Sequence, residues 1–308
     1  MYWAVPAEPA GKPLSRRPEE RHGKKSGSGW GNGLLGVIIF SGSLPATRVA
    51  VAEFSPVFLT SARAAIAAVL GAGFLFALRQ ARPARGDIVP LAVVALGVVV
   101  GFPLLTGLAL QHMSAAHSIV FIGVLPLATA LFGVLRGGER PKPAFWLFSL
   151  LGAATVAGFA LSQGGGGTLT GDLLMIAAIL FCGLGYAEGA TLSRRLGGWQ
   201  VISWALLASL PAMAPLALFS LPGSLAGIGL PAWIGLGYVS VFSMLIGFVF
   251  WYRGLALGGI AGVGQLQLLQ PFFGLMLAAA FLHETIAWSM LASTVAVVFC
   301  VAGARRYA

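Results

Sequence analysis

Long apolar runs, separated by short polar joins, fill almost the whole chain. Each run is about 20 residues long, which is the length that an α-helix needs to cross the hydrocarbon core of a bilayer. The joins hold glycine, proline and charged residues, which end helices. The pattern predicts ten membrane-spanning helices, at residues 30–51, 56–78, 88–110, 115–135, 143–163, 170–192, 200–221, 230–252, 256–282 and 286–304.

Two stretches of the chain, 107–139 and 254–284, are copies of one pattern. Both open on Gly-Leu-Ala-Leu, and both hold a proline followed thirteen positions later by a glutamate. These pairs are Pro126 with Glu139 and Pro271 with Glu284. Each copy belongs to a set of five predicted helices. Because five is odd, the second set is expected to insert upside down relative to the first, and such inverted repeats underlie alternating access in carriers.

The composition is that of a membrane protein. Only 9% of the residues are charged and 58% are hydrophobic, whereas a soluble domain carries about 25% charged residues. We therefore expect an all-α membrane protein of ten transmembrane helices, arranged as two inverted five-helix repeats around a central cavity. Residues 30–163 and 169–304 would form the repeats. Residues 1–29, rich in charge, proline and glycine, would form a disordered cytoplasmic tail.

The positive charges predict the orientation of the chain. The net charge is +10, and all lysines and arginines except Arg48 and Arg63 fall in the tail or at the helix ends on the same side. Cytoplasmic loops carry this excess, so both termini are expected in the cytoplasm and the protein in the cell inner (plasma) membrane. The cations lie in loops rather than on one folded face, which argues against nucleic-acid binding.

The chain resembles a known family of carriers. The five-plus-five layout, the two Pro…Glu helix endings and the segment Phe-Ser-Gly-Ser-Leu-Pro-Ala-Thr-Arg at 40–48 are similar to the drug/metabolite transporter superfamily, EamA type. Within it, the chain looks most like the YddG-type exporters of aromatic and other amino acids. This resemblance implies a basket-shaped bundle, with the fifth and tenth helices at its periphery and small organic substrates in its centre.

Polar side chains inside the apolar runs are the candidates for a substrate site, since a polar group in hydrocarbon faces a cavity or a partner. The candidates for substrate binding are Arg48, Arg63, His117, Phe121, Tyr186, Gln265, Gln267 and Gln270. A structural role is the alternative for each: Arg48 could pair with Glu53, and the glutamines could bond between helices. The aromatic residues Phe102, Phe248, Trp251 and Tyr252 are interpreted as lipid-facing or interfacial.

Glu188 is the one carboxylate placed well inside a predicted helix. A buried carboxylate can serve in proton coupling, so Glu188 is a candidate coupling residue. The alternative is an ion pair with Arg253 or Arg194.

The sequence favours a carrier over an enzyme. His283-Glu284 begins a zinc-protease motif, but Ala287 stands where the second histidine is required. We predict no metal or other cofactor. The predicted protein is a monomeric exporter of amino acids or similar small metabolites that works by alternating access, with membrane lipid as its surroundings. Efflux of lipophilic cations or toxic metabolites is the alternative, followed by a membrane enzyme acting on a lipid-linked substrate.

Overall fold

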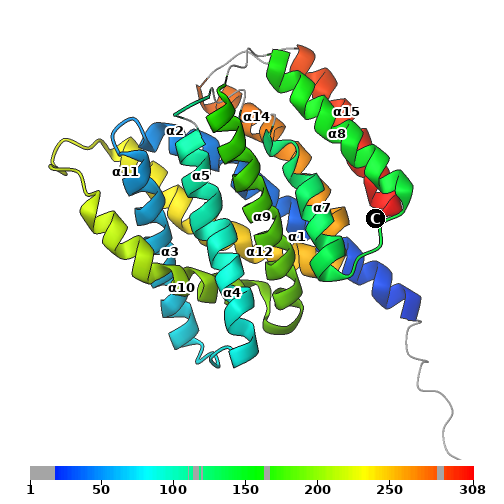
Figure 1. Ribbon diagram of the computed structural model, residues 1–308, viewed down its shortest axis with the longest axis horizontal. Helices are drawn as coiled ribbons and strands as arrows, with labels where there is room; N and C mark the ends of the chain where they lie inside the picture. Colours follow the sequence, from blue (N-terminus) through cyan, green and yellow to red (C-terminus); the bar gives the residue numbers. More distant parts are fainter. Residues whose placement is uncertain (1–17, 110, 114–117, 119–120, 163–166, 283–287) are drawn as a thin grey trace, which may run out of the picture.

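The computed structural model describes residues 18–109, 111–113, 118, 121–162, 167–282 and 288–308; within these ranges, the side chains of residues 18–26, 44, 48, 275, 278, 279, 281 and 282 are left out of the description. Every regular element in the described part of the chain is a helix (Figure 1). The elements are α1 (Pro18–Ser41), α2 (Ser43–Ala50), α3 (Pro56–Ala77), η1 (Arg85–Asp87), α4 (Ile88–Val94), η2 (Ala95–Gly101), α5 (Phe102–Ala109), α7 (Leu125–Gly137), α8 (Pro143–Ser162), α9 (Leu169–Leu196), α10 (Gly198–Phe219), α11 (Leu230–Tyr238), η3 (Val239–Ile246), α12 (Gly247–Gly258), α13 (Ile260–Gly264), η4 (Gln265–Leu269), α14 (Gln270–Leu282) and α15 (Trp288–Tyr307).

Seven helical segments of the described chain are long and apolar enough to cross a bilayer: 56–77, 85–109, 143–162, 169–196, 198–219, 230–258 and 288–307. A shorter apolar helix, α7, accompanies them. The three other predicted spans are interrupted. The run 30–51 is divided at Gly42 between α1 and α2, the run 115–135 lies partly outside the described residues, and the run 256–282 is divided into α13, η4 and α14.

Two boundaries differ from the sequence-based prediction. Helix α1 begins at Pro18, inside the range that was assigned to a disordered tail, because proline suits the first helical position and Glu19 to Lys25 contains good helix formers. The predicted break near Arg253 is absent. Helix α12 continues to Gly258, and the chain turns at Gly259, whose φ of +91° lies in the left-handed region that only glycine enters without strain.

The two copies of the Pro…Glu pattern run in opposite directions. Gly133 in α7 lies against the side chain of Ile260 in α13, and Gly264 in α13 lies against the side chain of Thr129 in α7. Positions that advance along α7 therefore retreat along α13 and η4. The two halves share a second feature. A π-helical segment lies in the third predicted span of each half, at residues 95–101 in the first and 239–246 in the second.

Helices α1 and α12 pack closely along a seam of glycines. A Cβ atom on Gly254 would lie 2.5 Å from the backbone N of Gly33, and one on Gly36 would lie 3.1 Å from the backbone N of Trp251. Small residues allow two backbones to approach in a membrane, where packing rather than hydrophobic burial holds helices together. The seam joins the first helix of one half to the third span of the other.

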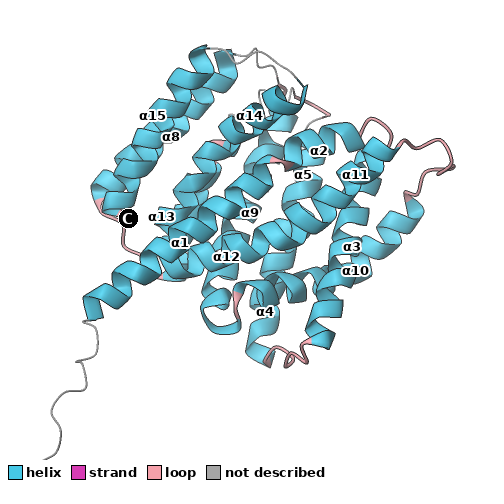
Figure 2. Ribbon diagram, turned by 180° about the vertical axis from the view of Figure 1, so that it is seen from behind, coloured by secondary structure: helices cyan, strands magenta, loops and turns pink. Residues whose placement is uncertain are grey.

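Helices α8 and α15 lie side by side at one edge of the molecule, apart from the main group of helices (Figures 1 and 2). Their outward faces are exposed at Leu147, Leu150, Val295 and Phe299. This position agrees with the peripheral placement that the family resemblance implied for these two segments.

The glycine seam yields a stability prediction. Gly254→Ala places a methyl group against the backbone of Gly33, where neither side can yield, so the free energy of unfolding should fall by about 1–3 kcal/mol. The measurement is thermal or denaturant unfolding of the purified protein in detergent.

Gly73→Ala in α3 is the matched control, because a Cβ there meets nothing within 4 Å. It should leave stability unchanged or raise it by about 0.5–1 kcal/mol. Equal losses in the two variants would show that the seam is not closely packed.

Candidate functional site

Five aromatic side chains from three helices meet inside the bundle. Phe40 of α1, Tyr186 of α9 and Phe248, Trp251 and Tyr252 of α12 are each no more than 7% exposed. The ring of Tyr186 lies 5.4 Å from that of Trp251, and the ring of Phe40 lies 5.0 Å from that of Phe248, both in edge-to-face geometry. We call these five residues the aromatic cluster. The interpretation of Phe248, Trp251 and Tyr252 as lipid-facing was wrong.

The local sequence explains how α12 presents its three aromatic residues. Positions 248, 251 and 252 are spaced three and four apart, so they share one helix face. On this side of α12, the backbone and Cβ of Trp251 lie against Gly36 of α1, and the ring of Tyr252 occupies the space that a side chain at Gly189 of α9 would fill. An indole and a phenol that would otherwise lie at the lipid interface are thereby enclosed.

Polar atoms at the aromatic cluster lack partners. The indole N–H of Trp251 and both amide atoms of Gln267 are buried without a hydrogen-bond partner among the described residues. The amide of Gln267 and the hydroxyl of Tyr186 face each other, but the two groups do not reach hydrogen-bond geometry. Burying such groups unpaired costs free energy, so Trp251 and Gln267 are suited to bind a molecule that enters the bundle.

The helical register separates the three glutamines. Residues 265–269 form a 3-10 helix, in which side chains three positions apart lie above one another. Gln265 therefore lies on the side of Leu268, which packs against Gly152 of the peripheral α8. Gln267 and Gln270 share the other side. Gln265 is fully buried and its amide is unpartnered, but the structure does not bring it to the aromatic cluster.

The remaining predicted site residues are placed as follows. Arg63 in α3 is partly buried, and its Nε has no partner among the described residues. Phe121 is partly buried and packs against the main core. His117 and the side chain of Arg48 lie outside the described residues, so their predicted roles stay predictions. Glu53 accepts the backbone N–H of Gly229 at 2.6 Å.

Glu188 forms an ion pair, although neither of the partners considered from the sequence is involved. Arg136 of α7 donates from Nε to Oε2 of Glu188 at 2.9 Å. The Glu188 side chain is 7% exposed and that of Arg136 is 53% exposed. The sequence did not indicate this pair, because the two residues are 52 positions apart and come together only where α7 packs on α9. The pairing favours the structural interpretation of Glu188 over proton coupling.

Glu139 joins the end of α7 to the beginning of α13. The backbone N–H groups of Ile260 and Ala261 donate to its two carboxylate oxygens at 2.6 and 2.7 Å. Arg194 of α9 donates to the same carboxylate at 3.2 Å. These N–H groups are the ones that a helix cannot satisfy internally, and the positive end of the helix dipole favours the negative charge. We call this arrangement the Glu139 clasp.

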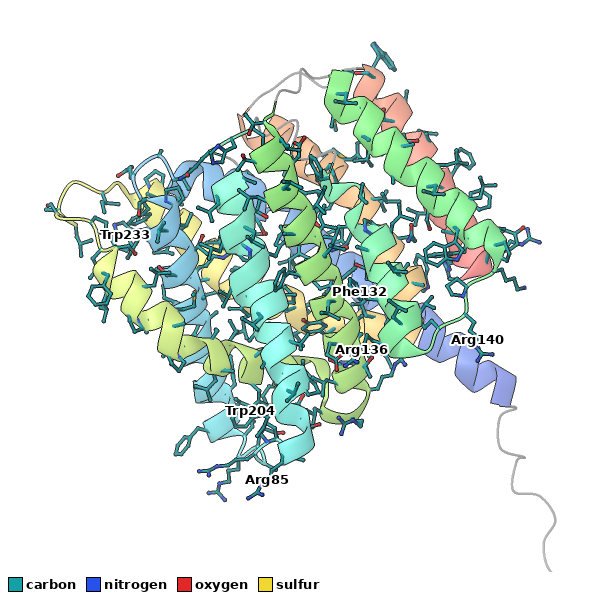
Figure 3. The ribbon with its side chains drawn as sticks, in the orientation of Figure 1. Arg85, Phe132, Arg136, Arg140, Trp204 and Trp233 are labelled. Carbon is teal, nitrogen blue, oxygen red and sulfur yellow. The ribbon has the colours of Figure 1, made fainter. Side chains whose placement is uncertain are left out.

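The Glu139 clasp lies at the end of the bundle that carries Arg85, Arg136 and Arg140, here named the arginine-rich end (Figure 3). A further ion pair at this end joins Arg195 of α9 to Asp87 at 2.6 Å. Together with the pair of Arg136 and Glu188, these contacts connect η1, α7, α9 and α13. The arginine-rich end is therefore closed by polar contacts between segments of both halves.

Comparison with known proteins identifies the family. The EamA-like transporter family matches the chain twice, over residues 27–161 and 169–305. The chain belongs to the EamA-like transporter family. It is thus a transporter of the drug/metabolite type, with multiple apolar helices that make it a multi-pass membrane protein, and the family is not one of enzymes.

Individual relatives of this EamA-family chain are also transporters. An uncharacterized transporter of Bacillus subtilis (strain 168), YdeK, is 66% identical over 284 residues, covering 92% of this chain and 99% of that protein. A probable terminal-alkyne amino-acid exporter of Streptantibioticus cattleyicolor is 24% identical, covering 82% of this chain and 84% of that protein. A crystal structure of a protein that is 19% identical has a TM-score of 0.77 and covers 90% of this chain and 98% of that chain, which shows a shared fold.

Sequence reasoning missed two residues that the geometry makes prominent. Trp251 was set aside as interfacial, although its spacing from Phe248 and Tyr252 could have indicated a shared aromatic face. Glu139 was recognised only as a marker of the repeat. Its recurrence thirteen residues after a proline in both copies was a signal for a structural role, while its acceptor geometry depends on the packing of α7 against α13.

The Glu139 clasp yields the second prediction. Glu139→Gln keeps one acceptor oxygen but directs an N–H₂ group at the other backbone N–H, so the free energy of unfolding should fall by about 1–3 kcal/mol. Denaturant unfolding in detergent measures this change.

Glu53→Gln is the control, since Glu53 is exposed and accepts a single backbone N–H, which a glutamine oxygen still accepts. Its effect should stay within about 0.5 kcal/mol. A loss as large as that of Glu139→Gln would contradict a special role for the clasp.

Proposed function

We propose that this EamA-family protein exports amino acids, aromatic and other, or similar small metabolites by alternating access. In this proposal it crosses the plasma membrane ten times, with both termini in the cytoplasm, and acts as a monomer. The arginine-rich end then faces the cytoplasm, as the positive-inside rule requires. The two halves are inverted repeats that enclose one central cavity.

The antiparallel course of the two Pro…Glu copies supports alternating access. When two related halves are inserted in opposite directions, the arrangement that closes one end can form again at the other end, and the two states have similar energies. The Glu139 clasp and the neighbouring ion pairs close the arginine-rich end. The equivalent residue of the other copy, Glu284, lies outside the described residues.

The observation that carries the substrate proposal is the pair of buried, unpartnered groups beside the aromatic cluster. The amide of Gln267 offers one acceptor and one N–H₂ donor group, and the indole of Trp251 offers a donor. Such uncharged groups suit the ammonium or carboxylate of a zwitterion, whose apolar side chain can contact the aromatic rings. Arg63, with its buried and unpartnered Nε, is proposed to attract the carboxylate.

Efflux of lipophilic cations is less well supported. Such cations are bound by aromatic rings through cation–π contacts and by carboxylates that are not already neutralised. Glu188, the carboxylate inside α9, is paired with Arg136. The amino-acid proposal also agrees with the relative from Streptantibioticus cattleyicolor, a probable terminal-alkyne amino-acid exporter.

Transport by the purified protein tests the proposal. In proteoliposomes loaded with unlabelled substrate, counterflow of labelled amino acids should appear for aromatic and other apolar amino acids. A labelled quaternary amine should not accumulate. If the quaternary amine moves and no amino acid does, the efflux alternative replaces the exporter.

A pair of variants tests the site. Gln267→Leu preserves size and removes the amide, so it should reduce amino-acid counterflow by about 10- to 100-fold, which corresponds to one or two lost hydrogen bonds to a charged group.

Gln265→Leu is the matched control, because Gln265 is equally buried and unpartnered but lies on the side of α8. It should leave counterflow within about twofold and raise stability, because an unsatisfied amide is replaced by an apolar group. Equal loss of transport in both variants would remove Gln267 from the site.

A further inference from the structure

A pocket opens at the arginine-rich end, away from the aromatic cluster. Its volume is about 380 Å³, and Trp30, Glu139, Arg140, Gly258, Gly259 and Arg305 are among its lining residues. These residues come from α1, the α7–α8 connection, the turn between α12 and α13, and α15. The pocket therefore lies where both halves of the chain meet the membrane surface.

The charges in this pocket favour an anion. Arg140 and Arg305 have no ion-pair partner among the side chains that the structure describes. The carboxylate of Glu139 already accepts two backbone N–H groups and Arg194. Ala308, which has no charged side chain, also lines the pocket. The balance in the pocket is positive.

The arginine from α15 is held in position. The guanidinium of Arg305 lies 4.8 Å from the centre of the Trp30 ring, a cation–π contact that fixes its plane. A fixed guanidinium presents its N–H groups as a fork that matches phosphate oxygens. An indole beside such a group, at the end of a membrane-spanning helix, is typical of the headgroup region of a bilayer.

We propose that this pocket binds the phosphate of an anionic lipid headgroup between Arg140 and Arg305. Basic pockets between transmembrane helices on the cytoplasmic side are known to take such headgroups, and the volume accommodates a phosphate with a short polar substituent. Glu139 and Gly259 form one wall of the pocket. A bound headgroup therefore spans elements of both halves and strengthens the closure made by the Glu139 clasp. Binding itself does not depend on the proposed substrate.

The test uses the full-length protein in lipid nanodiscs. Thermal unfolding is compared in phosphatidylcholine alone, in phosphatidylcholine with phosphatidylglycerol, and in phosphatidylcholine with inorganic phosphate in solution. Phosphatidylglycerol should raise the Tm of the native protein. If inorganic phosphate alone produces the same rise at millimolar concentration, the site takes free phosphate, and the lipid assignment is overturned.

Variants locate the effect. Each guanidinium removed should weaken lipid binding about fivefold, so Arg140→Gln with Arg305→Gln should abolish most of the rise in Tm. Arg82→Gln with Arg85→Gln is the matched control, because it removes the same charge from exposed positions at the same end, outside the pocket. The control should respond to phosphatidylglycerol as the native protein does.

Two further outcomes decide the proposal. If the control pair loses the response as fully as the pocket pair, the lipid acts through general surface charge and the pocket is not a site. If the pocket pair folds poorly, Arg305→Lys replaces it in the comparison: it keeps the charge but loses the planar fork, and it should show a weakened response with native-like unfolding in phosphatidylcholine. An undiminished response in Arg305→Lys would contradict the role of the stacked guanidinium.

Discussion

The carboxylate of Glu139 accepts the hydrogen bonds of backbone N–H groups at the start of α13. The first backbone N–H groups of α13 have no acceptor within the helix. Glu139 supplies both acceptors from another segment of the chain. The end of α7 is thus tied to the start of α13, and Arg194 brings α9 to the same point. The closure of the arginine-rich end depends on this contact, because the contact joins the two halves where their copied segments run past each other.

The interior shows a different use of polar groups. In the Glu139 clasp and the two neighbouring ion pairs, the carboxylates are paired with arginines, and the first backbone donors of α13 are satisfied. At the aromatic cluster, the indole of Trp251 and the amide of Gln267 are enclosed without partners among the described residues. In the proposed function, the paired groups close one end of the bundle and the unpartnered groups in the interior bind the substrate.

Much of the fold could be predicted from residue order. The apolar runs and the copied Gly-Leu-Ala-Leu and Pro…Glu patterns indicated a duplicated carrier, and the family assignment agrees with the resemblance. Gln267 and Tyr186 were both recognised as candidates, because amides and phenols are rare in hydrocarbon. Boundaries were less accurate: the turn at Gly259 was expected several residues earlier, since Arg253 looked like the end of a helix although α12 continues past it.

Contacts between distant segments could not be derived in the same way. Sequence spacing shows which residues share a helix face, but not which helix that face meets. Glu188 was therefore matched with arginines near it in the pattern, whereas packing of α7 on α9 brings it to Arg136. Trp251 was assigned to the lipid, whereas its side chain is fully buried and its backbone packs closely on Gly36 of α1. The sequence by itself determined that this chain crosses a membrane as two related halves, because hydrophobic length and repetition are properties of residue order. Only the tertiary structure decided which polar groups are satisfied and which remain available, because that depends on helix packing.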